Sequence, residues 1–307
     1  MPLSHLHLTW PFLAVTDRAG RSNGWCVLAG PLRKQHDLDA YHALRRSFRF
    51  VGFTSYVTFP SVQEGLVTDY GSLCEGWCHC FREPDVYMSR GTPKELISES
   101  DFVDHASISP DTVCQGGDPG KDFDFVYVCL PGQWKEMTKN WTLAKRCLHR
   151  LCGDLNLKGL LLGRWQILDL PFHKNLTIVG DVPHQRTLEY LRRSRLLFVP
   201  SIMDASPRIL AEALCLDVPI LVNEQILGGW KYVSTSSGVF FRSEDDVADA
   251  ARQCLRAGFQ PRRWFGENYG PELSSERLAA FLGRLSPDVD QTLHLQLERK
   301  VSYPAVS

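Results

Sequence analysis

The sequence has no long apolar run and no excess of charge of either sign. No window reaches the roughly 18 consecutive apolar residues of a membrane-spanning helix, and the N-terminal stretch lacks the basic start of a signal peptide. The formal net charge is -1 at pH 7, and the basic cluster Arg192, Arg193 and Arg195 is short. Nucleic-acid binders usually show a net basic balance or a dense basic stripe. We therefore expect no transmembrane segment and no nucleic-acid partner.

Motifs of several common enzyme classes are also missing. No G-x-G-x-x-G follows a predicted strand, which disfavours NAD binding, and there is no nucleophile elbow. The patch formed by Cys74, Cys78, His79 and Cys80 lacks a paired C-x2-C and a second half, so it favours a buried cluster over a zinc site. We expect neither a metal nor a resident cofactor.

The ten cysteines do not form the pattern of a disulfide scaffold. Four of them lie in apolar strands or helix faces, where a free thiol packs as a small hydrophobe. These are Cys129, Cys147, Cys215 and Cys254. This usage predicts a reducing compartment and a cytoplasmic location.

Length and composition favour two domains of ordinary globular type. The 307 residues, 44% hydrophobic and 22% charged, suffice for one large or two modest domains. A stretch rich in Gly, Pro and Asp at 109–122 is typical of a linker. We expect an N-terminal domain at 1–122 that includes this linker, a C-terminal domain at 123–285 and a tail at 286–307.

The second half alternates short apolar runs with helical patterns. The runs are continuous, which is typical of strands buried on both faces of a parallel sheet. They lie at 125–130, 159–163, 176–180, 196–200, 219–222 and 238–241. Helical periodicity fills most of the gaps, as at 141–152 and 247–255. This order predicts an α/β fold with right-handed βαβ units and a doubly wound parallel sheet.

The first half has a weaker pattern. Strands are predicted at 25–28 and 50–59, and a helix at 38–48. From 61 to 108 the signals are mixed, with Gly, Pro and Cys scattered through them.

Residues 200–222, PSIMDASPRILAEALCLDVPILV, contain the clearest candidate site. A predicted strand ends at Pro200, and Ser206 and Pro207 are favoured residues at a helix start. A loop that leaves a parallel strand and enters a helix is where α/β sheets bind ligands. The helix dipole and the amides at such a helix start suit phosphate.

Two carboxylates lie across this corner. Asp204 is in the loop, and Glu212 is about a turn and a half into the helix. Side chains placed in this way can bind two hydroxylated parts of one ligand. The spacing alone is better explained by an Asp that caps a turn and a Glu on the helix surface.

The segment resembles the signature of the family-four retaining glycosyltransferases, which have the GT-B fold. That signature is Pro-Ser, an acidic residue, a small loop, Glu-Ala after seven further residues, and a Pro-Val/Ile strand. The chain has Pro200-Ser201, Asp204, Glu212-Ala213 and Pro219-Ile220 in this order. The likeness covers roughly 125–241. It implies a GT-B-like protein with two Rossmann-like domains, of which the N-terminal one is short.

By this resemblance the C-terminal domain binds a nucleotide diphosphate sugar as co-substrate. Glu212 would bind the ribose hydroxyls. Asp204, which replaces the commoner Glu, would bind hydroxyls of the transferred sugar, with the amides of Ala205 and Ser206 facing the sugar or phosphate. Further donor-binding candidates are Gly132, Lys135, Asp181 and Val182.

Relatives usually carry an Arg and a Lys after the first strand of this domain, where fixed cations stabilise the leaving diphosphate. In this chain Leu-Pro-Gly follows that strand at 130–132, and the Gly-Arg is absent. Lys139 is the best match for the Lys, with Lys135 second, and Arg208 is a candidate for the missing cation. A solvated lysine and a surface arginine fit these positions equally well.

The resemblance places the acceptor beside the N-terminal domain. His79 and His105 are candidates for an acceptor-side histidine, although a lone His is more often structural. The implied reaction is retaining transfer to a hydroxyl, most simply of a glycan, with the leaving phosphate helping to deprotonate the acceptor. No glycosidase-type carboxylate pair is then required. Metal is expected to be dispensable because protein cations take its role.

Two other functions remain open at the level of sequence. A non-catalytic GT-B protein, which binds a nucleotide sugar or acts as an assembly partner, fits the short N-terminal half and the missing Arg. A phosphorylase-like or epimerase-like enzyme would act on the same class of ligand.

Overall fold

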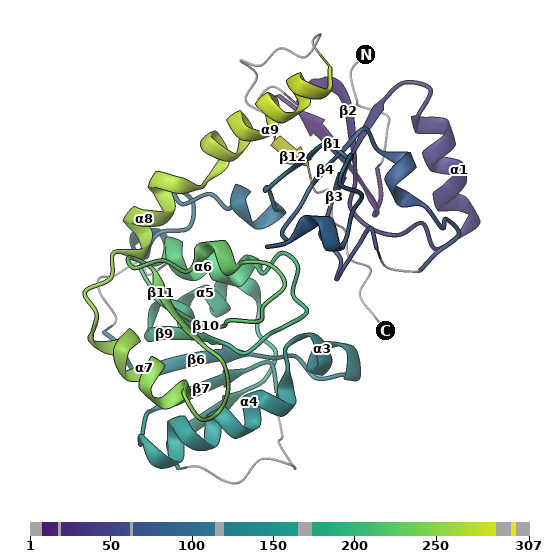
Figure 1. Cartoon of the computed structure of the whole chain (residues 1–307). Helices are drawn as coiled ribbons and strands as arrows, with labels where there is room; N and C mark the ends of the chain where they lie inside the picture. Colours follow the sequence, from purple (N-terminus) through teal and green to yellow (C-terminus); the bar gives the residue numbers. More distant parts are fainter. Residues whose placement is uncertain are drawn as a thin grey trace. The chain divides into compact units, whose positions relative to one another are not determined.

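The computed structural model describes residues 8–17, 20–61, 64–113, 120–164, 174–286 and 296–298. The chain divides into two compact units (Figure 1). The first unit consists of Met1–Phe102 and Pro271–Ser307, and the second unit of Val103–Gly270. In the described part of the chain, each unit contains one six-stranded sheet.

The first unit contains a mixed sheet. Its strands, in spatial order, are β12 (Gln296–Glu298), β1 (Phe12–Thr16), β2 (Ser22–Leu28), β3 (Arg49–Phe53), β4 (Gly76–Cys78) and β5 (Lys94–Glu95). β1 is antiparallel to β2 and β12, whereas β2 to β5 run parallel. Helix α1 (Gln35–Leu44) joins β2 to β3. The predicted strand at 50–59 is shorter in the structure, where β3 ends at Phe53. The residues after it form a loop, in which the Phe59 amide donates to the Tyr56 carbonyl and the Phe59 ring packs against Trp77.

Helix α9 (Pro271–Leu285) completes the core of the first unit. Leu278 and Phe281 are buried in the same cluster as Trp25 and Val51 of the sheet. A side chain at Gly76 would meet Phe281 at 2.8 Å, so the helix lies directly on β4.

These contacts divide the chain differently from the predicted boundaries at 122 and 285. Ile108 and Val113 are buried in the core of the second unit, Val113 at the end of the short helix α2 (Pro110–Val113). The predicted linker therefore begins with residues that pack in the second unit, and its 114–119 lie outside the described residues. Similarly, β12, in the predicted tail, pairs with β1. Boundaries inferred from Gly and Pro content miss such packing because it joins residues far apart in the chain.

The second unit contains the predicted parallel sheet. Its strands, in spatial order, are β11 (Gly238–Phe241), β10 (Ile220–Asn223), β9 (Ser194–Val199), β6 (Phe123–Val128), β7 (Gly159–Leu162) and β8 (Leu176–Val179). All of these strand pairs are parallel. In the order of the chain, β6 is the first strand of this sheet; β7 and β8 are added on one side of it, and β9 to β11 on the other. The strand order therefore reverses between β6 and β9.

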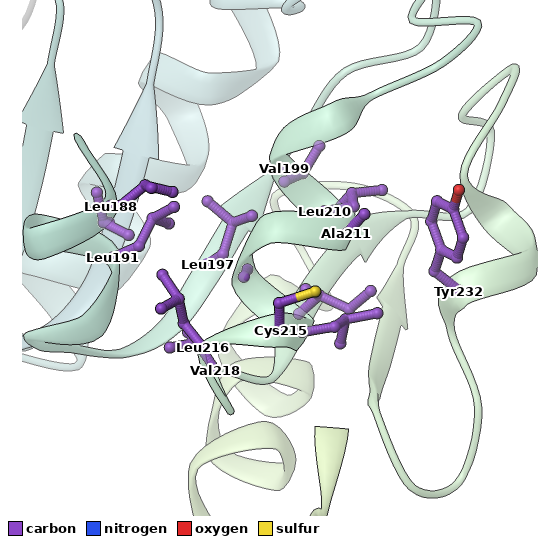
Figure 2. Packing of buried hydrophobic residues seen from close by; sticks show 14 of the residues in the cluster. Leu188, Leu191, Leu197, Val199, Leu210, Ala211, Cys215, Leu216, Val218 and Tyr232 are labelled. Atoms are coloured by element: carbon purple, nitrogen blue, oxygen red, sulfur yellow. The ribbon is translucent and has the colours of Figure 1, made fainter. Parts of the chain in front are cut away.

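Helices cover both faces of this sheet, which confirms the doubly wound prediction. Helices α5 (His184–Arg192) and α6 (Arg208–Cys215) pack on one face, against a cluster that includes Leu197 and Val199 (Figure 2). On the other face, α4 (Trp141–Leu148) and α7 (Val247–Arg256) pack against Phe125 and Phe198. The other helices described in the second unit are α3 (Gln133–Thr138), α8 (Pro261–Asn268), a π-helix at His149–Asp154 and a 3-10 helix at Trp230–Tyr232.

Short 3-10 helices in the first unit occupy Tyr70–Leu73, Pro84–Val86 and Glu99–Phe102. No helix in the described ranges is long and apolar enough to cross a membrane. Every cysteine that the structure describes is buried and free of disulfides. Burial raises the pKa of the Cys215 and Cys254 thiols to about 12, as expected for cysteines that pack as hydrophobes.

Candidate functional site

The carboxyl ends of β6 and β9 form the switch point of the second unit. Phe125 pairs with Leu196, and Val126 with Leu197, so the loops after the two strands leave the sheet at the same edge. The loop after β6 enters α3 and α4, and the loop after β9 enters α6. In open α/β sheets, ligands bind outside this edge where the strand order reverses.

An ion pair joins the two loops. The Lys139 ammonium, between α3 and α4, contacts Oδ2 of Asp204, which follows β9. The Tyr127 hydroxyl on β6 donates to the Lys139 carbonyl at 3.1 Å and so fixes the backbone beneath the lysine. The two charged side chains are 26% and 18% exposed, so the pair is partly open to ligands. Two of the predicted catalytic residues therefore meet at the switch point.

Glu212 lies on the buried face of α6, with its side chain 5% exposed. Arg208, one turn earlier, donates from Nε to Glu212 Oε1 at 2.7 Å, and His184 Nε2 lies 2.8 Å from the same oxygen. Burial by itself would raise the pKa of Glu212, but the hydrogen bonds and charges of His184 and Arg208 lower it overall. The hydrogen bond to Glu212 raises the pKa of His184, against the opposing effect of burial. Glu212 is thus a buried carboxylate whose Oε1 contacts both Arg208 and His184.

The loop that contains Asp204 is held by the loop that follows the neighbouring strand, β10. The Gly228 amide donates to the Asp204 carbonyl at 2.9 Å. The next residue, Gly229, has a φ of 81°, and a side chain there would meet Pro207 at 2.5 Å and Leu210 at 2.7 Å. The 228–229 loop therefore packs directly against the start of α6, which begins at Arg208, one residue after the predicted Pro207.

The other donor-side candidates lie at the same edge of the sheet. Gly132 precedes α3, and Lys135 is exposed on that helix. Asp181 and Val182 follow β8 and lead into α5, whose first residue is His184. The contact from His184 to Glu212 brings this third loop to α6, although no ion pair links Asp181 to the cluster among the described residues.

The two histidine candidates belong to different units. His79 follows β4 in the first unit, where it is buried and stacks on Phe81 with ring centroids 6.3 Å apart. His105 belongs to the second unit, which does not fit its predicted place in the N-terminal domain. It lines a cavity of about 470 Å³ together with Asp217 and Arg262, beyond the C-terminal end of α6. Asp204 precedes that helix, so His105 is separated from it by the length of α6.

Sequence reasoning missed two polar residues of this edge. His184 opens α5 and reaches Glu212, and Arg164 follows β7 with its side chain 8% exposed. The only sequence signal for Arg164 is a Gly-Arg pair at the end of an apolar run. Within the described residues, no three His, Cys, Asp or Glu side chains are grouped so that they could hold a metal ion.

Comparisons with known proteins support the fold. Neither protein-family models nor the sequences of curated proteins match the chain. Among solved structures, AviGT4, a glycosyltransferase involved in avilamycin A biosynthesis, is similar at a TM-score of 0.55 and 16% identity, over 78% of this chain and 69% of AviGT4. The chain has the GT-B fold.

Two further structures with this fold match this chain over different fractions of their own length. The lipopolysaccharide outer core galactosyltransferase WaaB matches at a TM-score of 0.60 and 13% identity, over 80% of this chain and 72% of WaaB. TarM matches at 0.54 and 13% identity over 78% of this chain, but the chain spans only 51% of TarM.

Proposed function

We propose that the chain is a glycosyltransferase that takes a sugar from a nucleotide diphosphate and transfers it to a hydroxyl acceptor, with a glycan as the first acceptor class to test. The observation that carries this proposal is the contact of Lys139 with Asp204 across the switch point, with Glu212 on the helix that follows. A cation for the phosphate, a carboxylate for the sugar and a carboxylate for the ribose, in the roles proposed here, would then lie at one edge of one sheet. AviGT4 and WaaB, which share the fold, are glycosyltransferases.

Each side chain has a defined role in donor binding. The Glu212 carboxylate, which His184 and Arg208 contact through Oε1, accepts hydrogen bonds from the ribose hydroxyls through Oε2. Asp204 binds hydroxyls of the transferred sugar, and the amides of Ala205 and Ser206 at the start of α6 face the diphosphate. Asp204 is one methylene shorter than Glu, so either the sugar lies closer to the loop than a Glu would require or a water bridges the two.

The proposed reaction is a retaining transfer. The bond between the anomeric carbon and the phosphate oxygen breaks, and the nucleoside diphosphate leaves with the electron pair. The acceptor oxygen bonds to the anomeric carbon on the same face of the sugar, and its proton passes to the departing phosphate. Lys139 and Arg208 stabilise the negative charge that develops on the diphosphate. These cations and the helix start make a divalent metal dispensable.

A ligand panel tests donor binding first. Thermal unfolding is measured with UDP-, GDP- and ADP-sugars, because a ligand that binds only the folded state raises the melting temperature. One base class should raise it in the native chain, and Glu212→Ala should abolish most of that shift. Glu267→Ala is the matched control, since Glu267 forms an i,i+4 pair with Arg263 as Glu212 does with Arg208, but is exposed.

Turnover is then measured as release of the nucleoside diphosphate in the presence of glycan acceptors. Release that requires an acceptor supports transfer. Binding without release across the acceptors contradicts it and indicates a non-catalytic nucleotide-sugar-binding protein. Flat melting curves across the whole donor panel contradict the donor site itself.

A further inference from the structure

Arg164 is a buried cation that contacts three elements at the edge of the sheet. Its Nη2 donates to Glu136 Oε1 on α3 at 2.7 Å and lies 3.7 Å from the Cys129 thiol at the end of β6. Its guanidinium carbon lies 4.1 Å from the ring centre of Trp141, the first residue of α4. Arg164 therefore joins β6, α3 and α4 from the end of β7.

Two of these contacts flank Lys139 in the sequence. Glu136 precedes the lysine by three positions and Trp141 follows it by two. The chain turns sharply between them, because Asn140 has a left-handed φ of 51°. The Tyr127 ring, whose hydroxyl bonds to the Lys139 carbonyl, stacks on Trp141 with an interplanar angle of 11°. The short segment that carries Lys139 is thus fixed on both sides by Arg164 and from the sheet by Tyr127.

A stabilising surface ion pair does not explain this arrangement. The Arg164 side chain is 8% exposed, whereas its partner Glu136 is 37% exposed. The cation is therefore removed from water much more than the carboxylate that pairs with it. The Arg164 Nε is buried without a hydrogen-bond partner in the described part of the chain. Burying a guanidinium with incomplete hydrogen bonding is unfavourable, and an apolar side chain of similar size would fill the same space. A role in placing neighbouring groups accounts for retaining a cation here.

We propose that Arg164 is a positioning residue that holds the Lys139 ammonium opposite Asp204. This inference rests on the proposed function, in which Lys139 faces the leaving diphosphate. The loop after β6 lacks its own arginine, and of the two lysines in this segment only Lys139 is paired with Asp204 among the described contacts; its placement is fixed from β7. Arg164 does not itself contact the donor in this assignment.

Chemical labelling tests the placement without any ligand. The unliganded chain is treated with trace acetic anhydride, and the acetylation of each lysine is measured by mass spectrometry. Arg164→Met should raise the reactivity of the Lys139 amine about threefold or more. Without Arg164 the segment that carries Lys139 is less constrained, and the partly exposed ion pair with Asp204 alone holds the ammonium only weakly. Lys158, exposed before β7 and so at the opposite end of that strand from Arg164, is the internal control, and its reactivity should not change. Arg150→Met, which removes an exposed pair with Asp154, is the matched variant and should leave the reactivity of Lys139 unchanged.

A double-mutant cycle tests the route of the effect. Affinities for UDP, GDP and ADP are measured by calorimetry in the native chain, Arg164→Met, Lys139→Ala and the double variant. For the nucleotide that binds, Arg164→Met should weaken affinity about tenfold in the native background and less than about twofold once Lys139 is gone. Arg164→Lys should recover only part of the loss, because an ammonium cannot both stack on Trp141 and reach Glu136 as a planar guanidinium does.

The outcomes separate the two proposals. Unchanged Lys139 labelling, or equal losses in both backgrounds, overturns the positioning role of Arg164. If the native chain binds none of the three nucleotides, the donor site fails, while the labelling experiment still decides whether Arg164 places Lys139.

Discussion

Lys139 and Asp204 lie 65 positions apart in the sequence, yet their charged groups meet where the strand order of the second unit reverses. The contact follows from topology. β6 and β9 are adjacent and parallel, so a residue shortly after one strand reaches a residue shortly after the other. The proposed function depends on this meeting, and each prediction below changes one group of the cluster or of its support.

Asp204→Asn should reduce transfer far more than donor binding. The amide keeps the shape of the side chain but loses the charge that pairs with Lys139 and accepts hydrogen bonds from sugar hydroxyls. We expect kcat to fall about a hundredfold or more, the range for loss of a preorganised charged group, with nucleoside diphosphate affinity changed little. The measurement is steady-state kinetics together with calorimetry, and Asp249→Asn, at an exposed ion pair on α7, is the control. Equal loss in the two variants would remove Asp204 from the site.

His184→Gln should destabilise the fold in a pH-dependent way. The pKa of His184 is raised above its ordinary 6.5, so its pairing with Glu212 is complete below that pH and is lost as pH rises through the raised value. The pKa of Glu212 is lowered below its ordinary 4.5, so its contribution is present above that pH and is lost as pH falls through the lowered value. The pair therefore stabilises most between these two ordinary values.

Melting temperatures of native chain and variant across pH measure this effect. The difference should be largest at mildly acidic pH, vanish at alkaline pH and shrink with added salt, because the His184 ring is 58% exposed. In a Glu212→Gln background the same His184→Gln change should show no such profile, because the carboxylate that pairs with His184 is missing. A difference that grew towards alkaline pH would contradict the assigned pairing.

Gly229→Ala should disturb the start of α6. Its φ of 81° is strained for alanine, and the new methyl group would meet Pro207 at 2.5 Å. We expect a loss of about 1–3 kcal/mol in unfolding free energy, together with weaker nucleotide binding. Gly258→Ala is the control, since that residue has no neighbouring atom within 4 Å of an added methyl. Chemical denaturation and calorimetry measure the two effects, and native-like nucleotide affinity in Gly229→Ala would detach this loop from the site.

Excess chelator should leave transfer unchanged. Lys139, Arg208 and the amides at the start of α6 are proposed to stabilise the leaving diphosphate, the role that a divalent ion would otherwise have. Initial rates with and without EDTA test this directly. Loss of activity that Mn²⁺ or Mg²⁺ restores would refute the metal-independent mechanism, though not the donor site.

The sequence predicts the second unit well because its signals are local. Each of the six strands is a continuous apolar run, and the segment from Pro200 to Val222 combines a strand end, a helix start and two acids within one window. The structure confirms all six strands and places Asp204 and Glu212 on the predicted loop and helix.

The features that sequence reasoning missed are non-local. Arg164 and His184 reach the site from β7 and α5, and nothing near them in the chain marks their partners Trp141 and Glu212. The same applies to α9, which has an ordinary amphipathic sequence but packs in the first unit, far back in the chain. Periodicity shows that a helix is buried on one face and does not show against which sheet.

The most direct test is a crystal structure of the chain with the nucleotide diphosphate sugar that gives the largest thermal shift. The account predicts ribose hydroxyls within hydrogen-bonding distance of Glu212, the diphosphate beside Lys139 and the start of α6, and the sugar against Asp204. A nucleotide bound elsewhere on the chain, or a ribose with no contact to Glu212, would contradict it.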